Sequence, residues 1–295
     1  MAIARLDVEA GGLRVAALAA GDADAPLALC LHGFPDSAWS WAPLLESLAA
    51  GGWRAVAPFM RGYAPTAVPA DGVYQTAALA RDAVALHAAL GGDGRAVVIG
   101  HDWGAPAAYG AAIDAPDRWR AVVGMAVPPG RALGAAFLGD LAQIKRSWYM
   151  FFFQHGLADA VVPAGDLAFV DMLWRDWSPG FDGAAHAARA KDALRGDGRL
   201  AAALGYYRAT LGDGPRDPAL ADLQGRMGGQ WPTQPLLYLH GRDDGCVGAD
   251  VALAARTDAP PGARIEIVDG AGHFLQVERP DEVAGRVLAF LGGLA

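Results

Sequence analysis

Short apolar runs alternate with longer helical patterns over the first 130 residues of the chain. The runs are continuous, as expected of strands that are buried on both faces. Between them, Thr76–Leu90 repeats leucine or alanine on one face of a helix. The predicted strands are Leu13–Leu18, Leu27–Leu31, Arg54–Pro58, Ala96–Ile99 and Ala121–Val127. This alternation predicts a mostly parallel sheet with helices on both sides.

The pattern changes between Arg131 and Trp231, where strand signals almost disappear. Helical segments rich in aromatic residues replace them, and the loops between these segments are rich in Pro, Gly and Asp. The helical segments are Gln143–Gln154, Asp166–Trp174 and Arg199–Leu211, and the loops are Ser178–Gly183 and Gly212–Pro218. This stretch therefore predicts a helical insertion.

Strand patterns return at Pro235–His240 and Arg264–Val268, and a last helix is predicted over Pro280–Leu291. We therefore expect an α/β core in two parts, residues 1–130 and 233–295. A helical cap (lid) over residues 131–232 would be inserted between them. With 295 residues the chain is long enough to bury a full hydrophobic core.

Composition and charge narrow the classes of partner. Hydrophobic residues make up 53% of the chain and charged residues 19%, as in globular proteins. Lys and Arg total 24 against 32 Asp and Glu, which gives a net charge of −8. This excess argues against nucleic acid and anionic membranes as partners, because both need clustered positive charge. We expect a small-molecule partner and a monomer or homodimer.

Several special classes are also disfavoured by the sequence. It contains no run of 18 apolar residues that would predict a transmembrane helix. Charges at Arg5, Asp7 and Glu9 argue against a signal peptide. Two cysteines, Cys30 and Cys246, are too few for a disulfide scaffold, so we expect a cytoplasmic, reduced protein. Metal-binding His-Glu-x-x-His and nucleotide-binding Gly-x-x-x-x-Gly-Lys spacings do not occur, so we expect no metal and no cofactor.

A sharp turn is predicted after the strand Ala96–Ile99. The turn lies in the segment Val97-Val98-Ile99-Gly100-His101-Asp102-Trp103-Gly104-Ala105, which leads into a helix. Two glycines flank the position at which a nucleophile elbow carries its nucleophile, because a tight strand-to-helix turn needs small neighbours. Here that position holds Asp102. The alternative is that Asp102 caps the following helix, as aspartate often does.

Two later segments supply partners for a carboxylate nucleophile. The strand that ends in Leu239-His240-Gly241-Arg242-Asp243-Asp244-Gly245 makes Asp244 our choice for the orienting acid, with Asp243 as the alternative. After the next strand, Gly270-Ala271-Gly272-His273-Phe274 places a histidine in a loop. Nucleophile, acid and histidine in this chain order are typical of an α/β-hydrolase.

A turn that follows the early strand Leu27–Leu31 predicts an oxyanion hole. Its sequence is His32-Gly33-Phe34-Pro35-Asp36. Such a turn can direct a backbone N–H at a developing oxyanion, and we predict the N–H groups of Phe34 and Trp103 as the two donors. The alternative is a plain Gly-Pro turn that is closed by Asp36.

Taken together, these residues resemble the epoxide hydrolase and haloalkane dehalogenase branch of the α/β-hydrolase superfamily. The resemblance spans nearly the whole chain. It rests on His32-Gly33-Phe34-Pro35, Gly100-His101-Asp102-Trp103-Gly104, Asp244, and Gly272-His273 with Glu278-Arg279-Pro280 behind it. The family inserts a helical lid between the sixth and seventh core strands, where the sequence predicts a helical insertion.

The resemblance implies a two-step reaction. Asp102 would attack a tetrahedral carbon to form an alkyl-enzyme ester, which water activated by His273 and Asp244 would then hydrolyse. An epoxide oxygen leaves as a basic alkoxide and needs a proton donor, and epoxide hydrolases carry paired tyrosine acids in the lid. By position these roles fall on Tyr149 and Tyr207, with Tyr206 as the alternative to Tyr207.

The expected activity is therefore hydrolysis of an apolar epoxide to a vicinal diol. We expect His32, Trp103, Trp148, Phe152 and Phe274 to contact the substrate. A haloalkane dehalogenase is the first alternative, in which Trp103 and a second indole, from Trp148 or Trp174, would bind the halide. It fits less well because many dehalogenases have a halide-binding Asn where Phe34 stands. The second alternative is a catalytically silent binder of small molecules.

Overall fold

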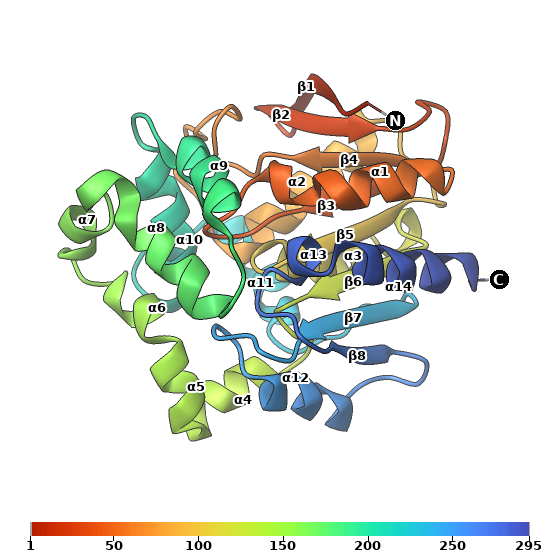
Figure 1. Cartoon of the computed structure of the whole chain (residues 1–295). Helices are drawn as coiled ribbons and strands as arrows, with labels where there is room; N and C mark the ends of the chain where they lie inside the picture. The colour runs from red at the N-terminus through yellow and green to blue at the C-terminus, as the bar shows by residue number, and fades with distance from the viewer. Residues whose placement is uncertain (1, 295) are drawn as a thin grey trace.

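The apolar runs form one eight-stranded sheet in the computed structural model, which describes residues 2–294 of the chain (Figure 1). The strand order is β1-β2-β4-β3-β5-β6-β7-β8. The pairs β1–β2 and β2–β4 are antiparallel and the remaining pairs are parallel. The strands are β1 (Ala4–Ala10), β2 (Leu13–Ala20), β3 (Leu27–Leu31), β4 (Arg54–Pro58), β5 (Val97–His101), β6 (Ala121–Met125), β7 (Leu236–Gly241) and β8 (Arg264–Val268). The predicted mostly parallel α/β fold is confirmed.

The strand β1 was not expected from the sequence. Its polar residues Arg5, Asp7 and Glu9 alternate with Leu6 and Val8, and the strand lies at the exposed edge of the sheet. This is the period-two pattern of a half-buried strand, which differs from the continuous apolar runs of the central strands.

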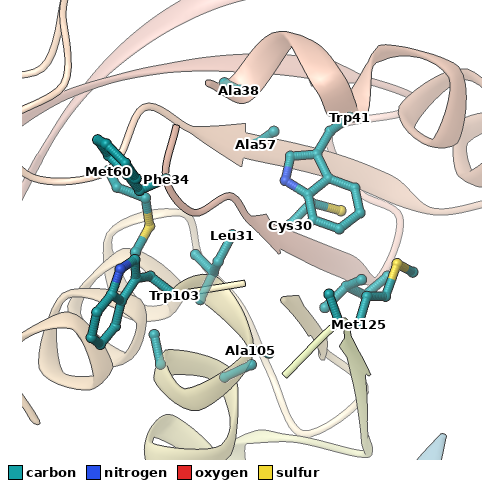
Figure 2. Packing of buried hydrophobic residues seen from close by; sticks show 14 of the residues in the cluster. Cys30, Leu31, Phe34, Ala38, Trp41, Ala57, Met60, Trp103, Ala105 and Met125 are labelled. Atoms are coloured by element: carbon teal, nitrogen blue, oxygen red, sulfur yellow. The ribbon is translucent and has the colours of Figure 1, made fainter. Parts of the chain in front are cut away.

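Helices cover both faces of the sheet. On one face, α1 packs with α13 and α14, and on the other, α2 packs with α3. These helices and α12 are α1 (Ala42–Ala50), α2 (Thr76–Ala89), α3 (Gly104–Asp114), α12 (Ala249–Ala254), α13 (Leu275–Glu278) and α14 (Pro280–Gly292). Figure 2 shows part of the core, in which Cys30, Trp41 and Met125 are completely buried. Since β3, β5 and β7 are buried along their whole length, the loops at their carboxyl ends have firm anchors.

The chain between β6 and β7 is helical, as predicted, and most of it gathers at one end of the sheet (Figure 1). Its helices are α4 (Ala132–Gly139), α5 (Leu141–Arg146), α6 (Trp148–Phe152), α7 (Ala158–Val161), α8 (Ala164–Trp177), α9 (Ala184–Leu194), α10 (Arg199–Leu211) and α11 (Ala221–Met227). The last of them, α11, packs against α2 and α3 of the core. The cap boundaries of 131 and 232 stay a prediction.

The helix expected over Gln143–Gln154 is in fact two short helices, α5 and α6. Asp140 accepts hydrogen bonds from the backbone N–H groups of Ala142 and Gln143, so that α5 begins two residues before the predicted start. The Gln143 amide donates to Ser147 Oγ and to the carbonyl of Cys246. These bonds tie the end of α5 to the loop after β7, and the chain turns at Ser147 before α6 begins.

Within residues 2–294, every helix is too short or too polar to span a bilayer.

Candidate active site

Asp102 lies on the sharp turn between β5 and α3. Its φ of +51° is in the left-handed region, which non-glycine residues rarely adopt outside strained functional turns. A Cβ on Gly100 would lie 2.0 Å from the carbonyl oxygen of Gly104, and one on Gly104 would lie 2.0 Å from that of Leu31. The two flanking glycines are therefore required by close backbone approach, as the sequence predicted. Trp103 is the N-cap residue of α3, so the alternative of a helix-capping Asp102 is not realised.

The loop after β3 supplies a backbone donor to Asp102. The N–H of Phe34 donates to Asp102 Oδ1 at 2.7 Å. Trp103, whose N–H is the second predicted donor, directly follows Asp102 at the start of α3. Asp36 accepts hydrogen bonds from Ser37 N–H and Ser40 Oγ, so it does close the turn. Asp36 thus closes the turn, and the Phe34 N–H of the same turn also contacts the predicted nucleophile.

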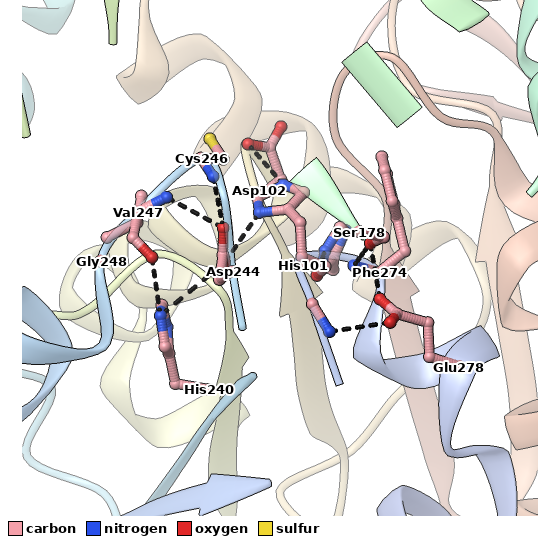
Figure 3. A network of polar contacts seen from close by, with 12 residues as sticks. His101, Asp102, Ser178, His240, Asp244, Cys246, Val247, Gly248, Phe274 and Glu278 are labelled. Atoms are coloured by element: carbon pink, nitrogen blue, oxygen red, sulfur yellow. Dashed lines mark hydrogen bonds and ion pairs between the residues drawn. The ribbon is translucent and has the colours of Figure 1, made fainter. Parts of the chain in front are cut away.

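A histidine and a second carboxylate complete the arrangement (Figure 3). His273 Nδ1 donates to Asp244 Oδ2 at 3.0 Å, and His273 Nε2 lies 3.5 Å from Asp102 Oδ2. Asp244 Oδ1 accepts the backbone N–H groups of Cys246 (2.7 Å) and Val247 (2.9 Å). Three loops, after β5, β7 and β8, therefore bring the predicted nucleophile, acid and histidine together.

The structure separates the two neighbouring acids. Asp244 is buried and contacts His273, whereas Asp243 is exposed and donates its backbone N–H to the carbonyl of Ala271. The geometry therefore favours Asp244, the predicted choice, over Asp243.

The charges of this cluster are strongly coupled. Burial alone would lower the pKa of His273, but attraction to Asp244, together with Cys246 and Asp102, raises it well above its ordinary value. Burial would raise the pKa of Asp244, but attraction to His273 and the hydrogen bonds that it accepts lower it. An imidazole between two carboxylates is therefore held firmly in position.

A second buried pair lies beneath the histidine. His101 Nε2 donates to the backbone carbonyl of His273 at 2.9 Å, and His101 Nδ1 lies 3.9 Å from Asp36 Oδ2. Burial and the charge of His273 lower the pKa of His101 to about 3. Burial raises the pKa of Asp36 to about 7, against the hydrogen bonds from Ser40 and Ser37. A neutral His101 therefore supports the backbone of the His273 loop.

A cavity of about 310 Å³ opens in front of Asp102. Tyr149 of α6 and Tyr207 of α10 line the same cavity, and their rings meet edge to face at 5.7 Å. The Tyr149 hydroxyl is hydrogen-bonded to Cys246 Sγ at 3.2 Å. Within residues 2–294 the buried Tyr207 hydroxyl has no hydrogen-bond partner. Burial raises the pKa of both phenols well above 10, so they keep their protons at neutral pH.

Tyr206, the alternative to Tyr207, makes its contacts outside the cavity. Its hydroxyl donates to the backbone carbonyl of Arg61 at 2.8 Å, and its ring stacks on Tyr74. Tyr206 is also absent from the residues that line the cavity in the described part of the chain. The structure therefore favours Tyr207.

Three residues of the core were expected to contact the substrate. Trp103 lines the cavity, but His32 and Phe274 do not. Both ring nitrogens of His32 are engaged by the backbone, through the Gly33 carbonyl (2.9 Å) and the Met60 N–H (3.0 Å). Phe274 is fully buried and stacks on Trp174 with 3.5 Å between ring centroids. These two residues hold the loops that carry Phe34 and His273, which corrects the expectation.

The two aromatic residues predicted from the inserted helices also lie outside the cavity. Trp148 precedes Tyr149 and is rotated from it by about 100° around α6, so that its side chain is 42% exposed. Phe152 stacks on Phe169 of α8. The apolar positions that do line the cavity include Leu133 and Phe137 of α4, which the sequence did not single out.

Two further contacts were missed at the sequence level. Cys246 lines the cavity, and its thiol lies beside Tyr149. Glu278 accepts hydrogen bonds from Ser178 Oγ (2.6 Å) and from Gly272 N–H (2.8 Å), which fixes the loop before His273 (Figure 3). Glu278 was part of the motif that carried the family resemblance, but its role depends on contacts between segments far apart in the chain.

Comparisons with known proteins agree with this geometry. A model of the alpha/beta hydrolase fold matches residues 26–280, and the chain belongs to this family. Epoxide hydrolase B of Mycobacterium tuberculosis (strain ATCC 25618 / H37Rv) is 31% identical over 350 residues, covering 96% of each chain. Epoxide hydrolase A of the same strain is 29% identical over 327 residues, covering 97% of each.

A solved structure shows the same similarity in three dimensions. An epoxide hydrolase from an endophytic Streptomyces superposes with a TM-score of 0.81 at 29% sequence identity. The match covers 99% of this chain and 96% of that one. The resemblance to epoxide hydrolases that the motifs predicted is confirmed.

Proposed function

We propose that the protein is an epoxide hydrolase that converts an apolar epoxide to a vicinal diol through an ester on Asp102. The observation that carries the proposal is that one cavity is lined by a carboxylate and by two protonated phenols, Tyr149 and Tyr207. The chain's relatives named epoxide hydrolase support the same activity. Residues 131–232 would then act as the cap over this cavity.

In the first step, Asp102 opens the epoxide. Oδ1 is held by the Phe34 N–H, so Oδ2 attacks a ring carbon and forms the ester bond while the ring C–O bond breaks. The epoxide oxygen takes the electron pair and a proton from Tyr149 or Tyr207. Such proton donation typically contributes about 10²–10⁴-fold in rate.

In the second step, the ester is hydrolysed. Because the ester carries no charge, His273 Nε2 loses its anionic neighbour and can take a proton from a water molecule. The hydroxide attacks the carbonyl carbon of residue 102, and negative charge develops on Oδ1, where Phe34 N–H already donates and Trp103 N–H would join it. Each such donor is typically worth about 2.7–4 kcal/mol. The alkoxide then leaves with the proton from His273, which releases residue 102 as a carboxylic acid. The proton of this acid returns to the tyrosine that was deprotonated in the first step, so that Asp102 and the phenol are both regenerated.

The cavity also favours an apolar substrate. Besides the polar groups, its wall is formed by side chains such as Trp103, Pro128, Leu133, Phe137 and Met150. A volume of about 310 Å³ fits a small aromatic or aliphatic epoxide.

Haloalkane dehalogenation is less well supported. It needs N–H donors for the departing halide, and Trp103 is the one tryptophan among the lining residues within the described part of the chain. Trp174 donates its indole N–H to the carbonyl of Pro35 at 2.8 Å, and Trp148 is half exposed and does not line the cavity. A catalytically silent binder is also less well supported, because it would not need Asp102, His273 and Asp244 in contact with one another.

The test is a paired assay in which the protein is given styrene oxide and, separately, a chloroalkane of similar size. We expect diol formation from the epoxide and at least about 10²-fold slower halide release, because the phenols assist only the alkoxide leaving group. Faster halide release than diol formation would favour the dehalogenase, and no turnover of either would favour the binder.

We also propose that the protein acts in a reducing compartment such as the cytoplasm, as a monomer or homodimer. The two unpaired, buried thiols Cys30 and Cys246 support the reducing environment. Light scattering of the purified protein tests the oligomeric state, and a larger assembly would refute that part of the proposal.

A further inference from the structure

A thiol stands beside the groups proposed to carry the chemistry. Cys246 Sγ, a carboxylate oxygen of Asp102 and an imidazole nitrogen of His273 all lie within 4.8 Å of one another. All three side chains are buried, and Asp102 and Cys246 form part of the cavity wall. They come from three separate loops, so no motif spacing in the sequence could have revealed the cluster.

His273 is oriented in the same way as histidines that bind metal ions. His273 Nε2 is buried and has no hydrogen-bond partner within residues 2–294, while Nδ1 donates to Asp244. Metal-binding histidines almost always donate the other ring N–H to a carboxylate or carbonyl, which fixes the ring and strengthens the ligand. The Tyr149 hydroxyl, 3.2 Å from Cys246 Sγ, can in turn donate to a thiolate.

We propose that Asp102, Cys246 and His273 form a binding site for a soft divalent cation, Zn²⁺ or Cd²⁺, whose occupancy blocks the cavity. One oxygen, one sulfur and one nitrogen ligand suit such cations far better than Mg²⁺ or Ca²⁺. Three protein ligands also leave the fourth tetrahedral position open toward the cavity.

The distances fit a tetrahedral ion after a small movement. With metal–ligand bonds of about 2.0–2.3 Å, neighbouring ligands of a tetrahedral ion lie roughly 3.3–3.8 Å apart. His273 Nε2 and Asp102 Oδ2 are already 3.5 Å apart. The sulfur must approach by at most about 1.5 Å, which a rotation of the Cys246 side chain can provide.

The charge balance is also favourable. On binding, the Cys246 thiol releases its proton to solvent, and His273 releases the proton of Nε2, because a coordinated thiol is deprotonated and a coordinating imidazole nitrogen must be free of its proton. The thiolate and Asp102 then neutralise the cation, and Asp244 balances any proton that His273 Nδ1 shares with it. A cation bound to Asp102 would remove its nucleophilic oxygen from use.

The experiment is a Cd²⁺ titration of the metal-free protein, followed by ultraviolet absorbance of the thiolate-to-cadmium charge-transfer band. Wild type is compared with Cys246→Ser and with Cys30→Ser, a matched control because Cys30 is the other buried thiol and lies in β3. We expect one equivalent to bind to wild type and to Cys30→Ser, and the band to disappear in Cys246→Ser. Asp244→Asn should weaken binding by about 10–100-fold.

A second readout is inhibition, which rests on the proposed function. Zn²⁺ should stop diol formation by wild type, chelation by EDTA should restore it, and Mg²⁺ should have no effect. In Cys246→Ser the Zn²⁺ concentration for half inhibition, relative to that variant's own rate, should rise at least about 10-fold.

The outcomes separate this inference from the proposed function. Absence of stoichiometric Cd²⁺ binding by an active wild type, or a charge-transfer band that persists in Cys246→Ser, overturns the site. Binding by a protein that turns over no epoxide leaves the site intact and overturns the function. Circular dichroism checks that each variant is folded, and Cys246→Ala replaces Cys246→Ser if the serine variant is not.

Discussion

The loops at the ends of the core strands and the helices inserted between β6 and β7 place their side chains by different means. In the core, Asp102, Asp244 and His273 each follow a strand of one buried sheet and meet within hydrogen-bond or ion-pair distance. In the insertion, Tyr149 and Tyr207 line the cavity, but Trp148 and Tyr206, the aromatic residues next to them in the chain, do not. Parallel strands fix where a loop begins, whereas a short helix is oriented only by what it packs against.

This difference predicts that core substitutions affect the chemistry most strongly. Asp102→Asn keeps an oxygen for the Phe34 N–H and tolerates the positive φ of the turn, but removes the charged nucleophile. We expect the rate of diol formation to fall by at least about 10⁴-fold. Initial rates on freshly prepared protein, with unchanged thermal unfolding, check the prediction. A rate within tenfold of wild type would mean that another group attacks.

Substitution of the orienting acid, Asp244, should have the second-largest effect on the rate. Asp244→Asn leaves His273 without its anionic partner and allows the wrong tautomer, so kcat should fall by about 10³–10⁴-fold. The control is Asp243→Asn, next in the chain but exposed and outside the cluster, which should keep wild-type kcat. Equal losses in both variants would show that the loop, and not the contact to His273, is what matters.

Substitutions in the inserted helices should have a smaller effect that depends on the leaving group. Tyr149→Phe and Tyr207→Phe should each lower kcat for styrene oxide by about 10²-fold, and the double variant should lose turnover. Tyr206→Phe, which removes the bond to the Arg61 carbonyl, should cost only about 1 kcal/mol in the free energy of unfolding. If Tyr206→Phe lowers kcat more than Tyr207→Phe, the assignment of the acids is wrong.

The smallest effect should distinguish two aromatic residues of the insertion. Phe137→Ala removes part of the cavity wall and should raise KM for styrene oxide by roughly 3–10-fold. Trp148→Ala, at a side chain of similar size that faces solvent and Phe152, should leave KM within about twofold. Steady-state kinetics of the two variants side by side make the comparison, and the opposite order would place the substrate elsewhere.

Much of the fold could be predicted because the central strands are continuous apolar runs. The predicted bounds of β3, β4 and β8 agree with the structure, whereas β1 was missed because its apolar residues alternate with charges. The elbow could be predicted because two glycines mark a backbone requirement that no other residue satisfies.

There is a physical reason why the rest of the site could not be predicted from the sequence. Whether Tyr206 or Tyr207 faces the cavity depends on how α10 packs, and the two residues carry the same side chain. Cys246 and Glu278 act through contacts with segments far away in the chain. Information of this kind is absent from local patterns and appears only when the loops are placed together.

The central claim is that Asp102 forms an ester with the substrate and that His273 is needed to hydrolyse it. Intact-protein mass spectrometry of His273→Gln after incubation with styrene oxide tests the claim most directly. We expect a mass gain of one substrate molecule, which disappears when Asp102→Asn is added to the same variant. No mass gain in His273→Gln, while wild type forms diol from the same epoxide, would contradict it.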